Sequence, residues 1–173
     1  MILKILGSIM ITAASCCTGN LFAERLIRRC KNLQDFITAL VNLENEILFK
    51  AAPLPEALYC CAKITNESIS PFLEQTASDI AGKTGKLISE IWSDNIHAFK
   101  ERLCLDESDA DIIKSLGATI GALDIDIQAN SIKLCRKNIG YALQRSLDDK
   151  EKYVKVYKSA GMLVGIFISI LFI

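Results

Sequence analysis

The sequence predicts an all-α protein, an antiparallel bundle of about six helices flanked by N- and C-terminal transmembrane helices. Apolar residues recur every three or four positions along most of the chain, which is the spacing of one helix face. No stretch of useful length alternates between apolar and polar residues as a half-buried strand does. Both ends are apolar: all acidic residues, and every basic residue except Lys4, lie between Glu24 and Lys158.

The composition fits a chain that lies partly in lipid. It has 173 residues, of which 51% are hydrophobic, a formal net charge of zero and a mean hydropathy of +0.30. This length is sufficient for one core, and the hydropathy is high for a soluble domain. We therefore divide the chain into an N-terminal transmembrane helix (1–23), a cytoplasmic helical bundle (24–158) and a C-terminal transmembrane helix (159–173).

The first expected span is Ile5–Ala23, which contains no charged residue. As a helix it reaches roughly 28 Å, close to the ~30 Å hydrocarbon core of a bilayer. A cleaved secretory signal and a lipoprotein signal, with Ala13-Ala14-Ser15-Cys16 as the lipobox, are the alternatives. Both need a more basic start than Lys4 alone, and a lipobox normally has Leu three residues before its Cys. The alternative function is thus a secreted or lipid-anchored helical binding protein.

Basic residues follow the first span and precede the second. By the positive-inside rule, both clusters indicate cytoplasmic ends, so the chain is expected to form a hairpin with its charged body in the cytoplasm. The same side chains can contact anionic lipid headgroups, at ~1 kcal/mol each near the surface. Nucleic-acid binding is disfavoured, because no aromatic residues interleave with them and nearby acids offset their charge. These residues are Arg25, Arg28, Arg29, Lys31, Lys150, Lys152, Lys155 and Lys158.

The second expected span, Ser159–Ile173, is short for a bilayer. A helix of this length reaches roughly 22 Å, so Tyr157 and Lys158 are expected at the interface, with the lysine snorkelling. Its Leu, Ile, Phe and Val residues nevertheless favour insertion by about 3–5 kcal/mol. Gly161 and Gly165 have the GxxxG spacing that lets another helix approach closely.

Between the spans the body is predicted to consist of helices joined by short connections. Pro53 ends the first of them, and Pro and Ser residues near 55 and 70 are helix-start signals. Gly82 and Gly85 are expected to close the third helix. In chain order we expect helices over Leu33–Ile47, Pro55–Ile64, Ser70–Ile80 and Lys86–Arg102, another capped by Ser108, and a last one from about Leu123.

Two places could carry chemistry, and both have simpler interpretations. The acidic cluster Asp106, Glu107, Asp109 and Asp111 lacks the Gly and the later Glu of a calcium loop. We interpret it as the first turn of the helix capped by Ser108, where acids offset the helix dipole. His97 is the single histidine, and a general base needs partners that the sequence does not place. A membrane-bound enzyme that uses His97 or these acids is the third hypothesis.

The cysteines do not form a metal-binding or redox pattern. There are seven of them and none has a C-x-x-C spacing; we expect reduced thiols that serve as small apolar residues. No nucleophile elbow or phosphate loop is visible. We therefore predict no catalytic residue, no metal, no cofactor and no small-molecule substrate.

A candidate partner-binding groove lies near residues 116–128. Gly117 and Gly121 are four residues apart, and glycines within a helix are expected where another backbone comes close. One interpretation is a tight helix–helix crossing. The other is a groove beside this crossing, with Asp124 and Gln128 one turn apart on a shared face and open to a partner protein.

Four blocks, in order and spacing, resemble the stage III sporulation protein AB family over nearly the whole chain. Ile120 stands where the family usually has Leu, and residues 78–106 match little. The blocks are Leu43-Glu44-Asn45-Glu46-Ile47; Pro53-Leu54-Pro55-Glu56-Ala57; Leu116-Gly117 with Ile120-Gly121, Asp124 and Gln128; and Lys155-Val156-Tyr157 with Gly161 and Gly165.

This resemblance implies a membrane protein of the mother cell in endospore-forming bacteria, part of the channel that links the mother cell and the forespore. It implies a cytoplasmic bundle similar to the cytoplasmic domains of the type II secretion system F protein. The expected partners are other sporulation channel subunits, including a secretion-type ATPase, besides the lipid bilayer. The family has no catalytic residues to transfer to this sequence.

Overall fold

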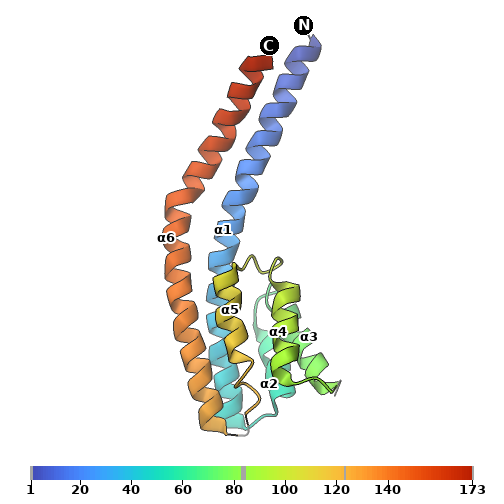
Figure 1. The fold of residues 1–173 in the computed structure, drawn as a ribbon, viewed down its shortest axis with the longest axis vertical. Coiled ribbons are helices and arrows are strands. Elements are labelled where there is room, and N and C mark those ends of the chain that lie inside the picture. The colour runs from blue at the N-terminus through green and yellow to red at the C-terminus, as the bar shows by residue number, and fades with distance from the viewer. Residues whose placement is uncertain (1, 83–84, 123, 173) are drawn as a thin grey trace. The chain divides into compact units, whose positions relative to one another are not determined.

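The computed structural model describes residues 2–82, 85–122 and 124–172, and within these ranges the chain forms six helices and no strand. The predicted all-α class is therefore confirmed. The helices are α1 (Ile2–Lys50), α2 (Leu54–Ile64), α3 (Ser70–Ala81), α4 (Ile88–Phe99), α5 (Glu107–Leu116) and α6 (Ile125–Phe172), labelled in Figure 1.

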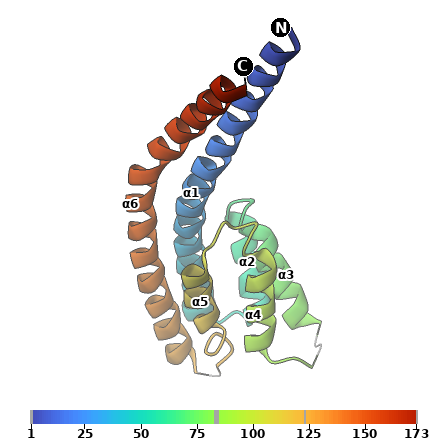
Figure 2. The ribbon, with the colours of Figure 1, turned by 45° about the horizontal axis from the view of Figure 1, so that its top comes forward.

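The chain divides into two compact units, each described separately below. One is formed by Met1–Cys30 together with Arg145–Ile173, and we call it the hairpin unit. The other, Lys31–Gln144, is called the body. Within the body, Figure 2 shows α2, α3, α4 and α5 gathered beside α1, while α6 runs antiparallel to α1.

The helices number six in total among the described residues, whereas we predicted about six in the bundle in addition to two spans. The reason is that α1 and α6 each continue without interruption from an expected span into the body. Residues 20–50 and 141–160 contain no Gly or Pro that would break a helix.

Helix α4 is shorter than the predicted Lys86–Arg102. It begins after Leu87, whose N–H donates to the Glu90 carboxylate at 3.1 Å, and it ends at Phe99.

Aromatic side chains hold the body together. Phe72 of α3 lies at their centre, with its ring 5.6 Å from Phe36, 5.2 Å from Trp92 and 6.0 Å from Phe99. Phe36, Phe72 and Trp92 are fully buried. The indole N–H of Trp92 donates to the Ile113 carbonyl at 2.8 Å, which joins α4 to α5. Each buried ring contributes about 1.5–3 kcal/mol through the hydrophobic effect.

A buried carboxylate joins α1 to α6 inside the body. Glu44 is 8% exposed, and its carboxylate accepts a hydrogen bond from Arg136 at 2.9 Å and lies 3.6 Å from Lys133. Removing a carboxylate from water is costly unless it is paired, and these two cations supply the pairing. Sequence reasoning missed this contact, because it joins residues far apart in the chain.

Candidate functional site

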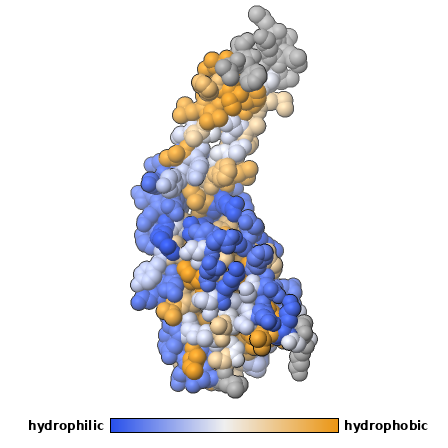
Figure 3. Space-filling model, viewed as in Figure 1, coloured by the Kyte–Doolittle hydropathy of each residue, from blue (hydrophilic) through white to orange (hydrophobic). Residues whose placement is uncertain are grey.

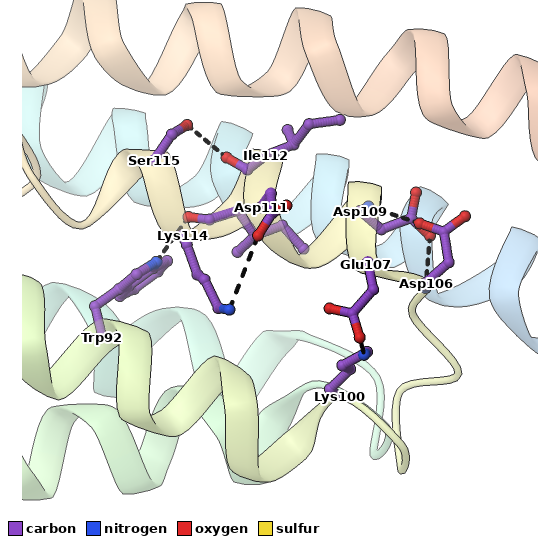
Figure 4. Close-up of polar contacts among 10 residues, drawn as sticks. Trp92, Lys100, Asp106, Glu107, Asp109, Asp111, Ile112, Lys114 and Ser115 are labelled. Carbon is purple, nitrogen blue, oxygen red and sulfur yellow. Dashed lines mark hydrogen bonds and ion pairs between the residues drawn. The ribbon is translucent and has the colours of Figure 1, made fainter.

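The acidic cluster forms the cap of α5. Asp106 has extended backbone, its carboxylate accepts the Asp109 N–H at 2.7 Å, and Asp109 accepts the Asp106 N–H at 3.2 Å. Figure 4 shows this reciprocal pair at the start of α5. The first-turn interpretation is thus confirmed, but Ser108 as the cap is wrong. Ser108 lies inside the helix, so the extended residue before the helix, Asp106, makes the capping bond.

Ion pairs engage the other acids of this cluster. Lys100 hydrogen-bonds Glu107 and thereby holds the pKa of this carboxyl below its usual range. Asp111 lies 3.9 Å from Lys114. Among the described residues, no group of three or more His, Cys, Asp or Glu side chains is arranged to hold a metal ion. The structure therefore places these carboxylates in contacts that stabilise the helix.

Gly117 and Gly121 do not lie within a helix, so the helix-interior interpretation is wrong. Gly117 follows the last residue of α5, and Gly121 lies in the turns beyond it. A Cβ on Gly117 would lie 2.9 Å from Trp92, and a Cβ on Gly121 would lie 2.6 Å from Ile88. Both glycines therefore make room for side chains of α4 rather than for another backbone.

The other two residues of the candidate groove lie at the start of α6, where Asp124 precedes the helix and Gln128 is in its first turn. The Asp124 carboxylate accepts the backbone N–H groups of Asp126 at 2.8 Å and Ile127 at 3.2 Å. The Gln128 side-chain amide donates to the Ala122 carbonyl. Asp124 is exposed and Gln128 half-buried. The four groove residues thus have local structural roles, and partner binding by them stays a prediction.

Small residues bring α1 and α6 together in the hairpin unit. At three glycines the helices are so close that an added Cβ would meet the backbone of the other helix. A Cβ on Gly19 would lie 2.6 Å from the Tyr157 carbonyl oxygen. On Gly161 it would lie 2.9 Å from the Ser15 carbonyl oxygen, and on Gly165 2.9 Å from the Thr12 Cα. The close approach predicted from Gly161 and Gly165 is confirmed, and the approaching helix is α1 of the same chain.

Hydroxyl groups add hydrogen bonds at this crossing. The Ser15 hydroxyl donates to the Gly161 carbonyl at 2.7 Å, and the Thr12 and Ser169 hydroxyls lie 2.9 Å apart. Gly19, Gly165 and Ser169 are buried, and among the described side chains of the hairpin unit the buried hydrophobic ones are the small Ala23 and Cys30. Small residues with hydroxyls are typical of helix pairs in membranes, where apolar burial provides no driving force.

Large apolar side chains of the hairpin unit point outward. Figure 3 shows them as a hydrophobic surface on the upper part of the view. Among the described residues, one helix, α6, is long and apolar enough to cross a membrane. An exposed apolar surface of this kind marks contact with lipid or protein. On α1 and α6 these exposed residues are Ile9, Met10, Leu21, Phe22, Met162, Leu163, Val164, Ile166, Phe167 and Ile170.

Seven of the eight basic residues predicted to contact the membrane surface belong to the hairpin unit, and Lys31 is the first residue of the body. Arg28 pairs with Glu24 at 3.0 Å, and Arg29 lies 3.7 Å from Asp149. Arg25, Lys152, Lys155 and Lys158 are exposed and Lys150 is half-buried. Lys150 and Lys155 line an open groove of about 400 Å³ with Leu147, Glu151 and Val154.

Aromatic rings stand among these cations. Phe22 and Tyr157 stack with their ring centroids 5.7 Å apart, and the Lys152 ammonium lies 5.0 Å from the Tyr153 ring. Rings and lysines together are typical of the membrane–water interface. Sequence reasoning predicted Tyr157 at such an interface and did not consider Phe22 and Tyr153, although aromatic residues beside a predicted span are a known signal of it.

The comparisons with known proteins agree with this architecture. A family model for stage III sporulation protein AB matches residues 4–173. The chain belongs to the stage III sporulation protein AB family. A relative in this family, stage III sporulation protein AB of Bacillus subtilis (strain 168), is 28% identical over 169 residues, which cover 98% of each chain.

A solved structure of stage III sporulation protein AB has the same fold. It superimposes with a TM-score of 0.66 at 21% sequence identity, and the match covers 72% of this chain and 98% of the solved one. Membership of the family implies a role in sporulation, which agrees with the resemblance seen in the sequence.

Proposed function

We propose that this chain is a non-enzymatic, membrane-anchored scaffold of the channel between mother cell and forespore, required for endospore formation. In this proposal α1 and α6 anchor it in the mother-cell membrane that faces the forespore. The helical body lies in the cytoplasm and docks other channel subunits, among them a secretion-type ATPase. Its fold is proposed to be related to the cytoplasmic domains of the type II secretion F protein.

The observation that carries this proposal is the crossing of α1 and α6 in the hairpin unit. Their contact is built from glycines and hydroxyls, while large apolar side chains such as Leu163 and Phe167 are 66% and 69% exposed. In water, this arrangement would hide small residues and expose large apolar ones. In a bilayer it is favourable, because lipid covers the outward side chains and the inner hydroxyls find partners.

The same crossing favours an uncleaved first helix over a removed signal peptide. Cleavage near Ser15 would remove Thr12, whose hydroxyl lies 2.9 Å from that of Ser169. It would also leave Gly165 of α6 without the Thr12 segment that packs against it. Mass spectrometry of the mature N-terminus tests this point: we expect the intact N-terminal segment, and a new N-terminus near Ser15 would establish the secreted or lipid-anchored alternative.

Labelling with a membrane-impermeant maleimide tests the topology. Single cysteines at Lys4, Ile64 and Ile173 are introduced into a cysteine-free chain; Ile64 is in the body and 63% exposed. In intact cells that express the chain without forming a forespore, so that the outer face of the membrane is open to the reagent, we expect Lys4→Cys and Ile173→Cys to react and Ile64→Cys to react only after permeabilisation. Reaction of Ile64→Cys in intact cells would place the body outside and reject the proposal.

Partner recovery tests the docking role of the candidate groove. Asp124→Lys with Gln128→Lys should weaken recovery of channel subunits from sporulating cells, with the protein still folded and in the membrane. Asp126→Lys, also an exposed residue at the start of α6, is the matched control. Unchanged recovery in the Asp124 and Gln128 variant would count against this groove.

A further inference from the structure

Helix α6 has a second apolar face within the body, which points away from the core. Ile132, Cys135 and Ile139 are buried on the core side. On the other side Ile127, Leu134 and Tyr141 are 50%, 61% and 60% exposed. These three side chains are seven residues apart in turn, and seven residues make about two helical turns. They therefore form one exposed line along the helix.

Two more exposed residues, Asn130 and Lys137, complete an alternating spacing of three and four along this line. We call Ile127, Asn130, Leu134, Lys137 and Tyr141 the α6 seam. The three-four spacing is that of the contact line between two paired helices, with one large apolar residue in each heptad and a polar residue, Asn130 or Lys137, at the other contact position. Polar residues at contact positions lower the stability of a pair and restrict its register, so the seam suits a helix with matching polar groups.

The net charge beside the α6 seam is positive. Between Ile127 and Gln144, α6 carries three basic residues, Lys133, Arg136 and Lys137, and no acidic one. The Glu44 carboxylate contacts Arg136 at 2.9 Å and Lys133 at 3.6 Å and so offsets one of the three positive charges. The Lys133 side chain is still 52% exposed, and the Lys137 ammonium lies 5.9 Å from the exposed Tyr141 ring. A helix that packs on the seam therefore meets cations at its edges.

We propose that the α6 seam binds one amphipathic helix of a partner protein whose apolar stripe is flanked by Glu and Asp. This inference rests on the proposed function, and it names a surface and a partner chemistry for the docking role. Opposite charge at the edges of paired helices selects the partner, as it does in coiled coils.

A second copy of the chain fits the seam less well. Two copies anchored in one membrane would present α6 in the same direction, so Asn130 would meet Asn130 and Lys137 would face Lys137. The two amides can hydrogen-bond to each other, but the lysines repel, and Lys133 adds a further cation on each side. An acidic partner helix removes this repulsion.

A lipid surface also fits less well. A helix that lies on a bilayer needs a broad apolar face. The α6 seam is one side chain wide and is interrupted by Asn130 and Lys137, and the buried face of the same helix is occupied by the core.

The experiment uses the full chain in nanodiscs of phosphatidylcholine and two fluorescent probe peptides. Both are helices of about three heptads with Leu at the core positions and one Asn to meet Asn130; one has Glu at the flanking positions and the other has Lys. We expect the Glu peptide to bind at least about tenfold more tightly than the Lys peptide. Leu134→Asp with Tyr141→Asp should weaken its binding about tenfold or more, and Lys133→Glu with Lys137→Glu should reverse the preference.

Phe49→Asp is the control, because Phe49 is 82% exposed in the body and outside the seam, and circular dichroism melts confirm folding of each variant. Equal binding of both peptides, or binding that ignores the Leu134 and Tyr141 changes, would overturn the proposal. So would seam-dependent binding to phosphatidylglycerol vesicles, or seam-dependent self-association in detergent.

The outcomes separate this inference from the proposed function. If neither peptide binds but partners are still recovered from cells, the seam is rejected and the scaffold role stands. If the topology test fails, the scaffold role itself is rejected.

Discussion

The body packs large side chains against one another, whereas in the hairpin unit α1 and α6 meet at glycines and hydroxyl groups. In the body, Phe36, Phe72 and Trp92 are fully excluded from solvent. In the hairpin unit, a Cβ placed on either Gly19 or Gly161 would lie 3.2 Å from the Cα of the other glycine. The large apolar side chains of this unit face outward.

Helices α1 and α6 take part in both kinds of packing, because Phe36 of α1 and Ile139 of α6 belong to the buried core of the body. In water, burial of apolar surface drives association, so the core takes the large residues. In lipid that drive is absent, and close packing and hydrogen bonds take its place. The following predictions test each side of this contrast, beginning with the largest expected effect.

Phe72→Ala should destabilise the body by about 3–5 kcal/mol, because it removes a fully buried ring that contacts three other aromatic residues. Phe49→Ala, at an 82% exposed ring, should change stability by less than about 0.5 kcal/mol. Denaturant unfolding followed by circular dichroism measures both. Equal effects of the two variants would show that the aromatic cluster does not hold the body together.

Glu44→Ala should cost about 2–3 kcal/mol, because it leaves Arg136 without its 2.9 Å partner. Arg136→Met alone should also destabilise, and the double variant should lose less than the sum of both single losses. Unfolding free energies of the three variants form a double-mutant cycle. Strict additivity would mean that the pair does not couple α1 to α6.

Gly161→Ala should destabilise the hairpin unit by about 1–2 kcal/mol, since its Cβ would lie 2.9 Å from the Ser15 carbonyl oxygen. Gly140→Ala is the matched control on α6: nothing lies within 4 Å of the Cβ position there, and Ala is the better helix former by about 1 kcal/mol. Thermal unfolding in detergent should therefore shift in opposite directions, and a shift in the same direction would contradict the tight crossing.

The last prediction concerns the pH dependence of stability and two buried thiols of the body. Burial raises the pKa of Cys61 and of Cys135 from 9.0 to about 12. Below pH 9 both the folded and the unfolded chain keep these thiols protonated. Between pH 9 and 12 the unfolded chain releases the protons and the folded chain retains them, so stability should fall as pH rises.

Cys61→Ala with Cys135→Ala should flatten this decline, as measured by unfolding midpoints across pH 8 to 11. At pH 8 maleimide should modify the half-buried Cys60 of the body faster than Cys61 and Cys135, which should react only after unfolding. Rapid modification of either buried thiol in the folded protein would contradict its burial.

Much of the fold could be predicted from local signals. Pro53 and the Ser70-Pro71 start signal indicated the helix boundaries near them, and the three-four periodicity indicated helices throughout. Contacts between distant residues could not be predicted: Glu44 with Arg136 and Trp92 with Ile113 depend on how the helices pack. The spacing of Gly117 and Gly121 led to a wrong prediction, because the same glycine pattern occurs in two situations. It occurs inside a helix that another backbone approaches, and it occurs in turns that leave room for the side chains of a neighbouring helix, here α4.

The candidate site shows the same limit. The GxxxG pattern predicted a close helix, but nothing in the sequence identified α1 as this helix or paired Ser15 with Gly161. The start of α5 was recognised from its acids, yet the choice between Ser108 and Asp106 as the cap depended on the backbone conformation near the helix start. Local composition thus indicates which elements form, and packing decides which atoms meet.

The central claim, that the two ends of the chain pair within one membrane, is tested most directly by a disulfide at the crossing. Thr12→Cys and Ser169→Cys, whose hydroxyls lie 2.9 Å apart, are introduced together into a cysteine-free chain and oxidised in carbonate-washed membranes. The account predicts rapid formation of a disulfide within one chain. Recovery of the protein in the wash, or cross-links formed only between chains, would contradict it.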